Sequence, residues 1–368
     1  MLFRSPLAGN WASAVQAINA QRAPVLAIDI PSGLHADTGR VLGCAVRATA
    51  TLSFIGLKQG LFTGAGPEYC GEIHFAGLGI PASLYGREIL AARRLDWAKI
   101  ASQLPRRPRD AHKGDLGHVL VVGGAPGFSG AARLAGEGAL RAGAGLVSVA
   151  THPAHAAVLN LGRPELMVAA VTTTADLAPL LARATAVAIG PGLGQDPWGR
   201  ELLTPVLASG KPLVLDADAL NWLARHPLRR EDWVLTPHPG EAARLLGCTP
   251  AEVQADRFSA ARRLRDEFGG TLILKGAGTL VMGAGRRPPG ICSQGNPGMA
   301  SGGSGDVLTG MVAAFLARGL AAEDAAEVAV CLHAAAGDAA ARAGEQGMLA
   351  SDLIAAIRPT LNQVEAQP

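Results

Sequence analysis

From His118 onward, short apolar runs alternate with stretches that carry a helical spacing of apolar residues, and this alternation limits the folds open to the chain. Strands that alternate with helices form mostly parallel sheets, since each helix carries the chain back to the edge where the previous strand began. The sequence therefore predicts an α/β domain with helices on both faces of its sheet. The expected strands are Val119–Val122, Leu146–Ala150, Ala186–Ile189, Leu213–Leu215, Trp233–Leu235 and Thr271–Leu274.

The front of the chain has a different pattern, with three β-rich runs and few helical ones. Strands are expected within Pro24–Ile30, Ala48–Phe54 and Gly71–Phe75, in a thin and incomplete domain. Residues 91–113 are rich in Arg and Pro, with the run 105–109 among them. We interpret them as a solvated linker, and the alternative is a phosphate-binding patch. The expected organisation is a fragment at 1–90, a linker at 91–113 and the α/β domain at 114–366.

Composition and charge exclude several classes of protein. The net charge is only +3 over 368 residues, with no long basic run, so we expect no nucleic-acid partner. The five cysteines are odd in number and far apart, which favours reduced thiols over a disulfide framework or a zinc site. No apolar segment is long enough to span a bilayer, and no secretory signal is visible. A cytoplasmic protein without a membrane partner is expected.

The most specific motif is a glycine-rich turn at residues 295–306, which ends in Gly305 and Asp306 and leads into a helix. Such a turn presents unpaired N–H groups and the positive end of the helix dipole to an anion. Asp306 falls in the first helical turn, beside the expected phosphate. The alternative, that Asp306 only caps the helix, leaves the glycines unexplained. The turn is not a Walker A loop, because no Lys follows the glycines.

Polar and glycine-rich residues follow several of the predicted strands. In open parallel sheets, ligands bind beyond the carboxyl ends of the strands, so these loops are expected to face one cleft. Each also has a structural explanation: His238 as a turn residue, Asp216 and Asp218 as loop caps, and Lys275 as a solvated side chain. The turn at 123–131 does not indicate a dinucleotide fold, because no acidic residue ends the next strand. The loops concerned are 123–131, 190–194, 216–220, 236–241 and 275–279.

Taken in order, these motifs resemble those of ADP-dependent (S)-NAD(P)H-hydrate dehydratases, which belong to the ribokinase-like superfamily. Residues 24–81 resemble the tail of the epimerase domain that is fused to this dehydratase in bifunctional repair enzymes, through 27–39, 57–66 and 77–81. The fold implied is a ribokinase-like domain preceded by a partial Rossmann-like α/β fragment. The matching segments of the dehydratase are 112–114 with Gly117, 123–132, 164–168, 189–194, 214–220, 235–246, 274–279 and 295–306.

The resemblance implies a repair reaction on hydrated NADH or NADPH, in the S epimer. ADP would phosphorylate the hydroxyl group, and loss of phosphate would restore NAD(P)H, with AMP as co-product. Asp306 would be the catalytic base, and Mg²⁺ would neutralise the phosphates. The substrate would contact Ala131, Gly192, His238 and Asp306, and the nucleotide would contact Lys275, Gly276, Ala277, Gly278, Thr279 and Gly305.

Two other functions stay open at this point. One is an ATP-dependent kinase of the same superfamily, acting on a small alcohol and sharing the glycine-rich turn. The other is a nucleotide-sensing module, which would not need the Asp306 carboxylate. In the epimerase remnant, Asp29 matches a substrate contact and Ser32 a potassium ligand, so K⁺ is a candidate cofactor there. We expect no epimerase activity, because no glycine-rich loop precedes Asp29. We also expect a homo-oligomer.

Overall fold

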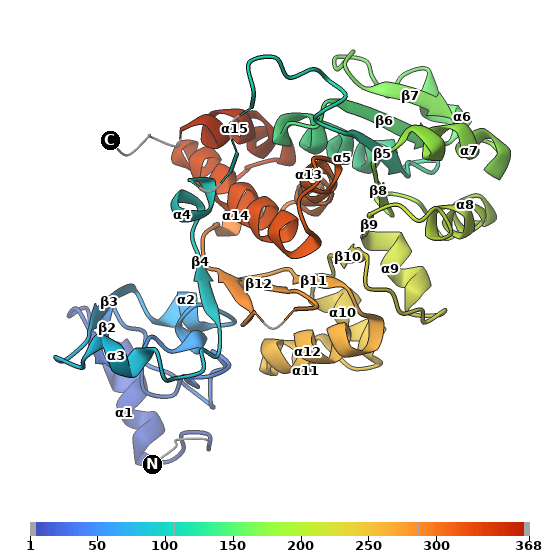
Figure 1. Ribbon diagram of the computed structural model, residues 1–368. Helices are drawn as coiled ribbons and strands as arrows, with labels where there is room; N and C mark the ends of the chain where they lie inside the picture. The colour runs from blue at the N-terminus through green and yellow to red at the C-terminus, as the bar shows by residue number, and fades with distance from the viewer. Residues whose placement is uncertain (1–4, 103, 106, 286, 364–368) are drawn as a thin grey trace.

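The computed structural model describes residues 5–102, 104–105, 107–285 and 287–363. The described chain forms a small N-terminal unit and a larger α/β unit built on one long sheet (Figure 1). No helix among these residues is long and apolar enough to cross a membrane.

The large sheet has ten strands in the order β4-β13-β12-β11-β10-β9-β8-β5-β6-β7. Every neighbouring pair from β11 to β7 is parallel, as the sequence predicts, whereas β12 is antiparallel to both of its neighbours. The strands are β4 (Arg93–Leu95), β5 (His118–Val122), β6 (Leu146–Thr151), β7 (Met167–Ala170), β8 (Ala186–Ile189), β9 (Leu213–Leu215), β10 (Trp233–Leu235), β11 (Thr271–Leu274), β12 (Thr279–Met282) and β13 (Gly290–Cys292).

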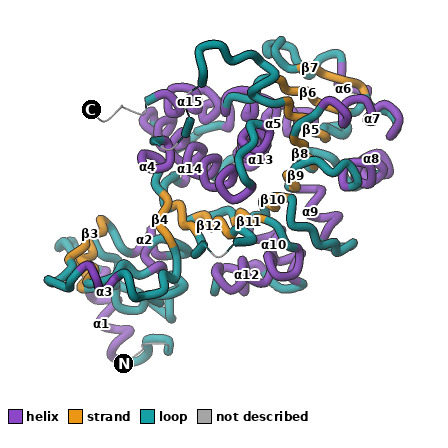
Figure 2. The backbone as a smooth tube through the Cα atoms, in the orientation of Figure 1, coloured by secondary structure: helices purple, strands orange, loops and turns teal. Residues whose placement is uncertain are grey.

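Helices cover both faces of this sheet (Figure 2), which explains why β8, β9 and β10 are apolar at every position. Along β5, Val119 and Val121 enter one apolar cluster, while Leu120 and Val122 enter the other. One face carries α4 (Trp97–Ala101), α5 (Ser129–Ala142), α13 (Ser304–Ala317), α14 (Ala322–Ala340) and α15 (Ala350–Asn362). The other carries α7 (Thr174–Arg183), α8 (Pro197–Leu207), α9 (Ala217–Leu223), α10 (Pro239–Leu246), α11 (Pro250–Ala255) and α12 (Arg257–Phe268). The short helix α6 (Pro153–Ala156) follows β6.

Two glycines let helices α5 and α13 approach closely enough to fix the start of α13. A side chain at Gly310 would overlap the carbonyl oxygen of Ala135, and one at Gly138 would lie 2.5 Å from that of Val307. Backbone therefore packs on backbone where α13 crosses α5. This contact holds the glycine-rich turn and Asp306 at the carboxyl edge of the sheet.

The six strands predicted for the large domain are all present, but four further strands were missed. β7 lies at one edge of the sheet, and β12 and β13 follow β11 without an intervening helix, so β12 and β13 fall outside the alternation of strand and helix that predicts the other strands. The fourth, β4, lies inside the segment interpreted as a linker. It pairs with β13, and Leu95, Trp97 and Ala101 are buried against the large unit. The linker interpretation therefore fails for residues 93–101, whose apolar side chains pack against the large unit.

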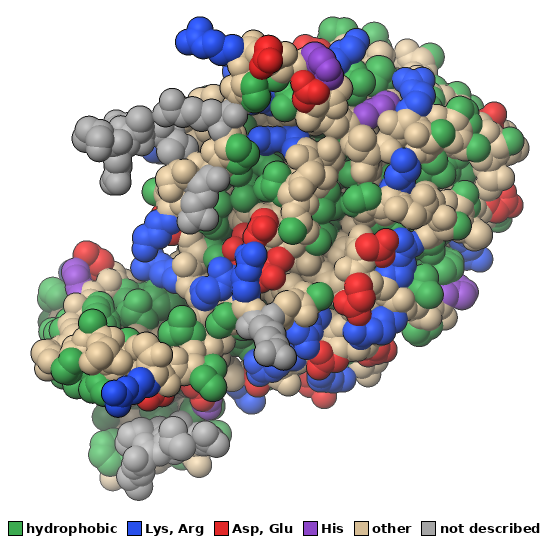
Figure 3. Space-filling view, viewed as in Figure 1, with side chains coloured by type: hydrophobic (Ala, Val, Ile, Leu, Met, Phe, Trp, Pro, Cys, Tyr) green, Lys and Arg blue, Asp and Glu red, His purple; other side chains and the backbone are tan. Residues whose placement is uncertain are grey.

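The N-terminal unit contains a three-stranded parallel sheet, β1 (Leu26–Ile28), β2 (Ala50–Phe54) and β3 (Glu72–Ala76), at the predicted places. Its helical segments are α1 (Asn10–Asn19), η1 (Gln59–Leu61), α2 (Gly66–Tyr69) and α3 (Ala82–Tyr85). Hydrophobic side chains gather on its surface in Figure 3, at the lower left, and Leu26, Ile28 and Phe75 are more than half exposed. Part of this small sheet is therefore uncovered.

Candidate active site

The loops after β5, β8, β9, β10 and β11 meet at the carboxyl edge of the sheet, as the sequence predicts. The loops after β5 and β8 are joined by a hydrogen bond from Ala125 N to Gly192 O, at 2.7 Å. Those after β10 and β11 are joined by one from Lys275 N to Pro237 O, at 2.9 Å. The N-terminus of α13 completes this group. Sequence-distant residues thus form one site.

A buried ion pair lies at the centre of the site. Asp216 is 2% exposed and accepts hydrogen bonds from Lys275 Nζ at 2.8 Å and from Thr309 Oγ1 at 2.7 Å. Lys275 Nζ also lies 3.8 Å from Glu241 Oε2. Burial opposes the charge of Lys275, but these two carboxylates outweigh it and raise the pKa of the ammonium group. Lys275 is therefore a fixed cation, and not the solvated side chain that was the alternative.

Asp306 lies in the first turn of α13, facing the same charges. Burial, followed by the charge of Asp216, raises the pKa of Asp306 to about 7, and Lys275 opposes the shift. A carboxylate with this pKa can exchange a proton efficiently near neutral pH. Helix capping alone would not require such an environment.

The glycine-rich turn presents free amides beside Asp306. The N–H groups of Gly305 and Asp306 have no acceptor among the described residues, and Gly303 has a φ of +92°. The next residue, Ser304, contacts the buried His333, whose Nε2 lies 2.9 Å from Ser304 O. Burial lowers the pKa of His333 to about 4, so its ring is neutral and Nε2 donates. The sequence analysis did not identify His333. The one sequence feature that could have indicated it is its position as a polar residue within an otherwise apolar helical stretch.

His238 caps helix α10, which is one of the two roles considered for it. Its Nδ1 accepts hydrogen bonds from Gly240 N at 3.0 Å and from Glu241 N at 3.4 Å. Burial, then the charges of Lys275 and Arg244, lowers the pKa of the ring. Because Nδ1 accepts these hydrogen bonds, the proton of the neutral ring is on Nε2. The side chain is half exposed at the edge of the site. Capping therefore leaves Nε2 as the one donor of the ring, and it lies 3.4 Å from Glu241 Oε1.

Ala131 and Gly192 lie next to each other on the other side of the site. Gly192 has a φ of +56°, and a side chain there would come within 3.2 Å of Ala131 Cβ and 2.6 Å of Phe128 O. Asp218 accepts a hydrogen bond from Gly194 N at 2.8 Å, so it is the loop cap that was considered as its alternative. The loop after β8 is thus held by close contacts with Phe128 and Ala131 and by a hydrogen bond to Asp218.

The predicted nucleotide loop, residues 275–279, comprises the turn between β11 and β12 and the first residue of β12. Gly276 and Gly278 have φ values of +134° and +64°, and Thr279 Oγ1 donates to Gly276 O at 3.0 Å. A side chain at Gly305 would come within 3.2 Å of Lys275 Nζ. The structure therefore brings the nucleotide loop directly against the glycine-rich turn.

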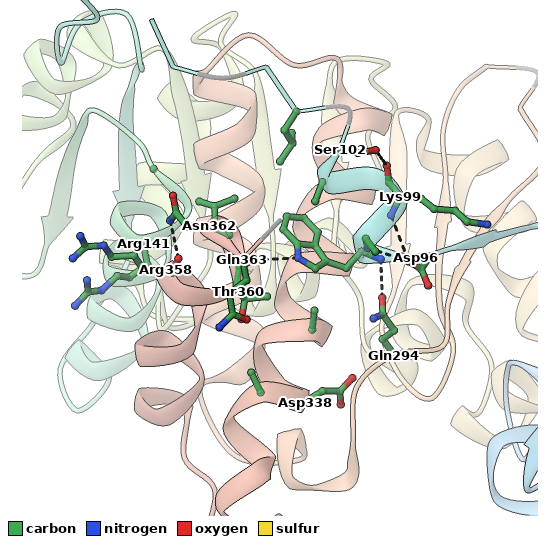
Figure 4. A pocket seen from close by; sticks show the side chains of 18 of the residues that line it. Asp96, Lys99, Ser102, Arg141, Gln294, Asp338, Arg358, Thr360, Asn362 and Gln363 are labelled. Carbon is green, nitrogen blue, oxygen red and sulfur yellow. Dashed lines mark hydrogen bonds between the residues drawn. The ribbon is translucent and has the colours of Figure 1, made fainter. Parts of the chain in front are cut away.

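A cavity of about 1920 Å³ lies elsewhere, between α4, α14 and α15 (Figure 4). None of the predicted site residues lines it. Its lining includes Trp97, Arg318 and Arg107 from the Arg-rich run, and Arg107 donates to Gly143 O at 2.8 Å. Arg106 of the same run lies outside the described residues. Arg107 thus ties its segment to the end of α5.

In the N-terminal unit, Asp29 has an unusual φ of +69° and forms an ion pair with Lys58. Partial burial disfavours its charge, but Lys58 and the amide of Phe54 hold the pKa of Asp29 below its usual value. Lys58 also donates to Phe54 O at 2.9 Å, and sequence reasoning missed it. Ser32 is exposed, and its potassium role stays a prediction.

A mostly parallel sheet between two helical layers, with an acidic residue and a glycine-rich turn at a helix N-terminus, defines a ribokinase-like protein. Residues 119–359 match the family model described as NAD(P)H-hydrate dehydratase, and residues 1–60 match that of the YjeF-related protein N-terminus. The chain therefore belongs to the NAD(P)H-hydrate dehydratase family.

Curated relatives extend the similarity into the N-terminal unit. The chain is 48% identical to the bifunctional NAD(P)H-hydrate repair enzyme Nnr of Coxiella burnetii, over 95% of this chain and 71% of that enzyme. It is also 48% identical to the Escherichia coli enzyme of the same name, over 94% of this chain and 66% of that one. The chain thus spans about two thirds of the length of these relatives.

Solved structures support the fold. A ribokinase-like superfamily protein from Enterococcus faecalis matches with a TM-score of 0.70 and 30% identity, over 76% of this chain and 99% of that one. An ADP/ATP-dependent NAD(P)H-hydrate dehydratase from Bacillus subtilis, co-crystallised with ATP/Mg²⁺, matches with a TM-score of 0.64 and 28% identity, over 74% and 99%. The predicted ribokinase-like fold is confirmed.

Proposed function

We propose that this chain dehydrates the S epimer of hydrated NADH and NADPH, with ADP as the phosphoryl donor. The observation that carries the proposal is Asp306, with a pKa of about 7, beside free helix amides and the Asp216–Lys275 ion pair. Membership of the NAD(P)H-hydrate dehydratase family supports the choice of substrate.

The reaction we propose has two steps. Asp306 removes the proton from the hydroxyl group of the hydrate, whose oxygen attacks the β-phosphorus of ADP while AMP leaves. The phosphate ester then loses phosphate, and a proton leaves the neighbouring carbon, which restores the ring double bond. In this proposal the free amides of Gly305 and Asp306 and the Lys275 ammonium, which lies beside Gly305, stabilise charge on the transferred group.

Magnesium and the nucleotide are proposed to bind together. No group of three or more metal-ligating His, Cys, Asp or Glu side chains occurs among the residues described. That absence fits an ion carried mainly by the phosphates, which is how Mg²⁺ commonly binds at nucleotide sites. When bound, Mg²⁺ would neutralise phosphate charge. Homo-oligomer formation, cytoplasmic location and the absence of epimerase activity stay predictions.

The decisive experiment supplies the purified protein with hydrated NADH and either ADP or ATP, and follows recovery of NADH absorbance. Recovery with ADP supports the proposal. Phosphorylation of another small alcohol without recovery would indicate the kinase alternative. Nucleotide binding without turnover of either kind would indicate the sensor.

The pH dependence of this reaction should report on Asp306. Because the base must be ionised, kcat/KM for the hydrate should fall about tenfold for each pH unit below about 7, and level off above it. Initial rates between about pH 5 and 9 measure this profile. A profile that stays flat through neutral pH would contradict an Asp306 base with a raised pKa.

His238→Ala should raise KM for the hydrate by about tenfold, the effect of losing roughly 1.4 kcal/mol of ligand contact, with a smaller change in KM for ADP. It should also lower Tm, because the cap of α10 is lost. His238→Asn is the matched control, since Asn is a good N-cap but has no Nε2 donor. Tm should recover in this variant while KM stays high. Recovery of both would show that His238 only caps the helix.

A further inference from the structure

The N-terminal unit contacts the nucleotide loop through one short turn, residues 62–64, which follows η1. Thr63 is fully buried, and its hydroxyl group lies 3.1 Å from Gly278 O and 3.3 Å from Ala277 O. Gly64 N donates to Ala277 O at 3.2 Å. A side chain at Gly278 would overlap the carbonyl oxygen of Phe62, so the two backbones are in direct contact.

A buried arginine joins these two segments from the inside. Arg257 is 0% exposed, and its Nε donates to Thr63 Oγ1 at 3.0 Å. Its Nη2 lies 3.0 Å from Leu274 O, 3.2 Å from Lys275 O and 3.4 Å from Gly278 O. Burial lowers the pKa of Arg257 to about 10, which leaves the guanidinium charged at neutral pH. Arg257 therefore links Thr63 to three carbonyl groups at or beside the nucleotide loop.

The 62–64 turn is itself held firmly by the N-terminal unit. Gly60 N donates to Ala36 O at 2.7 Å, and Ala65 N donates to Gly39 O at 3.0 Å. Leu61 and Phe62 enter the same apolar cluster as Leu280 of β12. The turn is thus a fixed support, continuous with the core of the large unit.

The nucleotide loop needs such a support because two of its five residues are glycines with positive φ. Glycine loses the most conformational freedom on ordering, so a loop of this composition is costly to hold in one shape. Contacts that order a binding loop in advance increase affinity, since the ligand does not have to order it.

We propose that Thr63 and Arg257 are positioning residues that order the loop 275–279, so that the N-terminal unit sets the affinity of the dehydratase site for its adenine nucleotide. The inference rests on the proposed function, because it assigns the loop to the nucleotide. It gives the N-terminal unit a role in the dehydratase reaction that does not depend on any activity of its own.

The test is Thr63→Val in the full chain, which keeps the shape of the side chain and removes its hydroxyl group. Loss of a buried hydrogen bond that orders the loop should raise the Kd of ADP by about fivefold. Calorimetric titration with ADP measures Kd, and steady-state kinetics should show a similar rise in KM for ADP. KM for the hydrate and kcat should change by less than about twofold, since none of the hydrogen bonds of Thr63 involves Asp306.

Two control variants separate positioning from stability. Thr51→Val also removes a buried hydroxyl–carbonyl bond of the N-terminal unit, to Cys70 O at 2.7 Å, but Thr51 does not contact the loop. Its Kd for ADP should equal that of the wild type. Thr63→Ser retains the hydroxyl group and should restore affinity. An equal loss of affinity in Thr51→Val, or in Thr63→Ser, would overturn the inference.

Hydrogen exchange in the wild-type chain gives a second measurement that needs no variant. Saturating ADP should slow exchange in a peptide that covers residues 60–66 as well as in the loop. Slowing in the loop alone would overturn the inference while leaving the proposed function intact. A wild-type chain that binds neither ADP nor ATP would overturn the proposed function itself, together with the inference.

Discussion

Replacing Asp306 by Asn should lower kcat for dehydration by about 10²–10⁴-fold, because Asn cannot accept the hydroxyl proton. We expect no loss of thermal stability in this variant. Asp306 is buried near two other carboxylates, Asp216 and Glu241. Burial and the repulsion from these carboxylates both disfavour the charge of Asp306. Removing that charge relieves the repulsion, so Tm should stay the same or rise. The Kd of ADP should change by less than about threefold, well below the loss expected in rate.

The matched control for this variant is Asp324→Asn. Asp324 also lies in the first turn of a long helix, α14, but it is on the surface and pairs with Arg287. The substitution removes the same favourable interaction with a helix dipole. Rapid-quench measurement of AMP release, with Kd and Tm measured in parallel, compares the two variants. If Asp306→Asn retained more than about a third of wild-type turnover, Asp306 could not be the base.

Lys275→Met should impair both stability and catalysis. The variant leaves Asp216 buried without its cation, and breaking one partner of a buried ion pair typically costs about 3–5 kcal/mol. At about 2–4 °C for each kcal/mol in a domain of this size, Tm should fall by roughly 6 °C or more. KM for ADP should rise, since Lys275 begins the nucleotide loop and its ammonium group lies beside Gly305.

A second consequence of Lys275→Met identifies the electrostatic role. Lys275 is the charge that opposes the rise in the pKa of Asp306, so its loss should raise that pKa further and move the acid limb of the rate profile to higher pH. Lys99→Met, on the exposed side of α4, is the control and should leave Tm and the profile unchanged. An unshifted acid limb in Lys275→Met would show that Lys275 does not act on the base.

Local patterns in the sequence predict much of the fold and of the candidate site. Short, mainly apolar runs of three to five residues between helical stretches predict buried parallel strands, and the carboxyl ends of such strands share one edge. Asp306 could be placed in a first helical turn because the glycines before it and the apolar spacing after it are both local signals. The strand β4 could not be predicted, because its stability comes from pairing with β13, almost two hundred residues later.

The sequence by itself determined the order of the strands along the chain, the glycine-rich turn at the start of a helix, and the polar residues that follow the strands at one edge of the sheet. Only the tertiary structure decided which of those residues act on one another. Asp216 and Asp218 stand two positions apart, yet one is buried against Lys275 and the other caps a loop. Spacing along the chain cannot distinguish them, because burial and partners depend on residues that approach only in the folded state. For the same reason the contacts of Thr63 could not be predicted. Its hydroxyl group bonds to Arg257 and Gly278, which lie more than 190 residues away in the sequence.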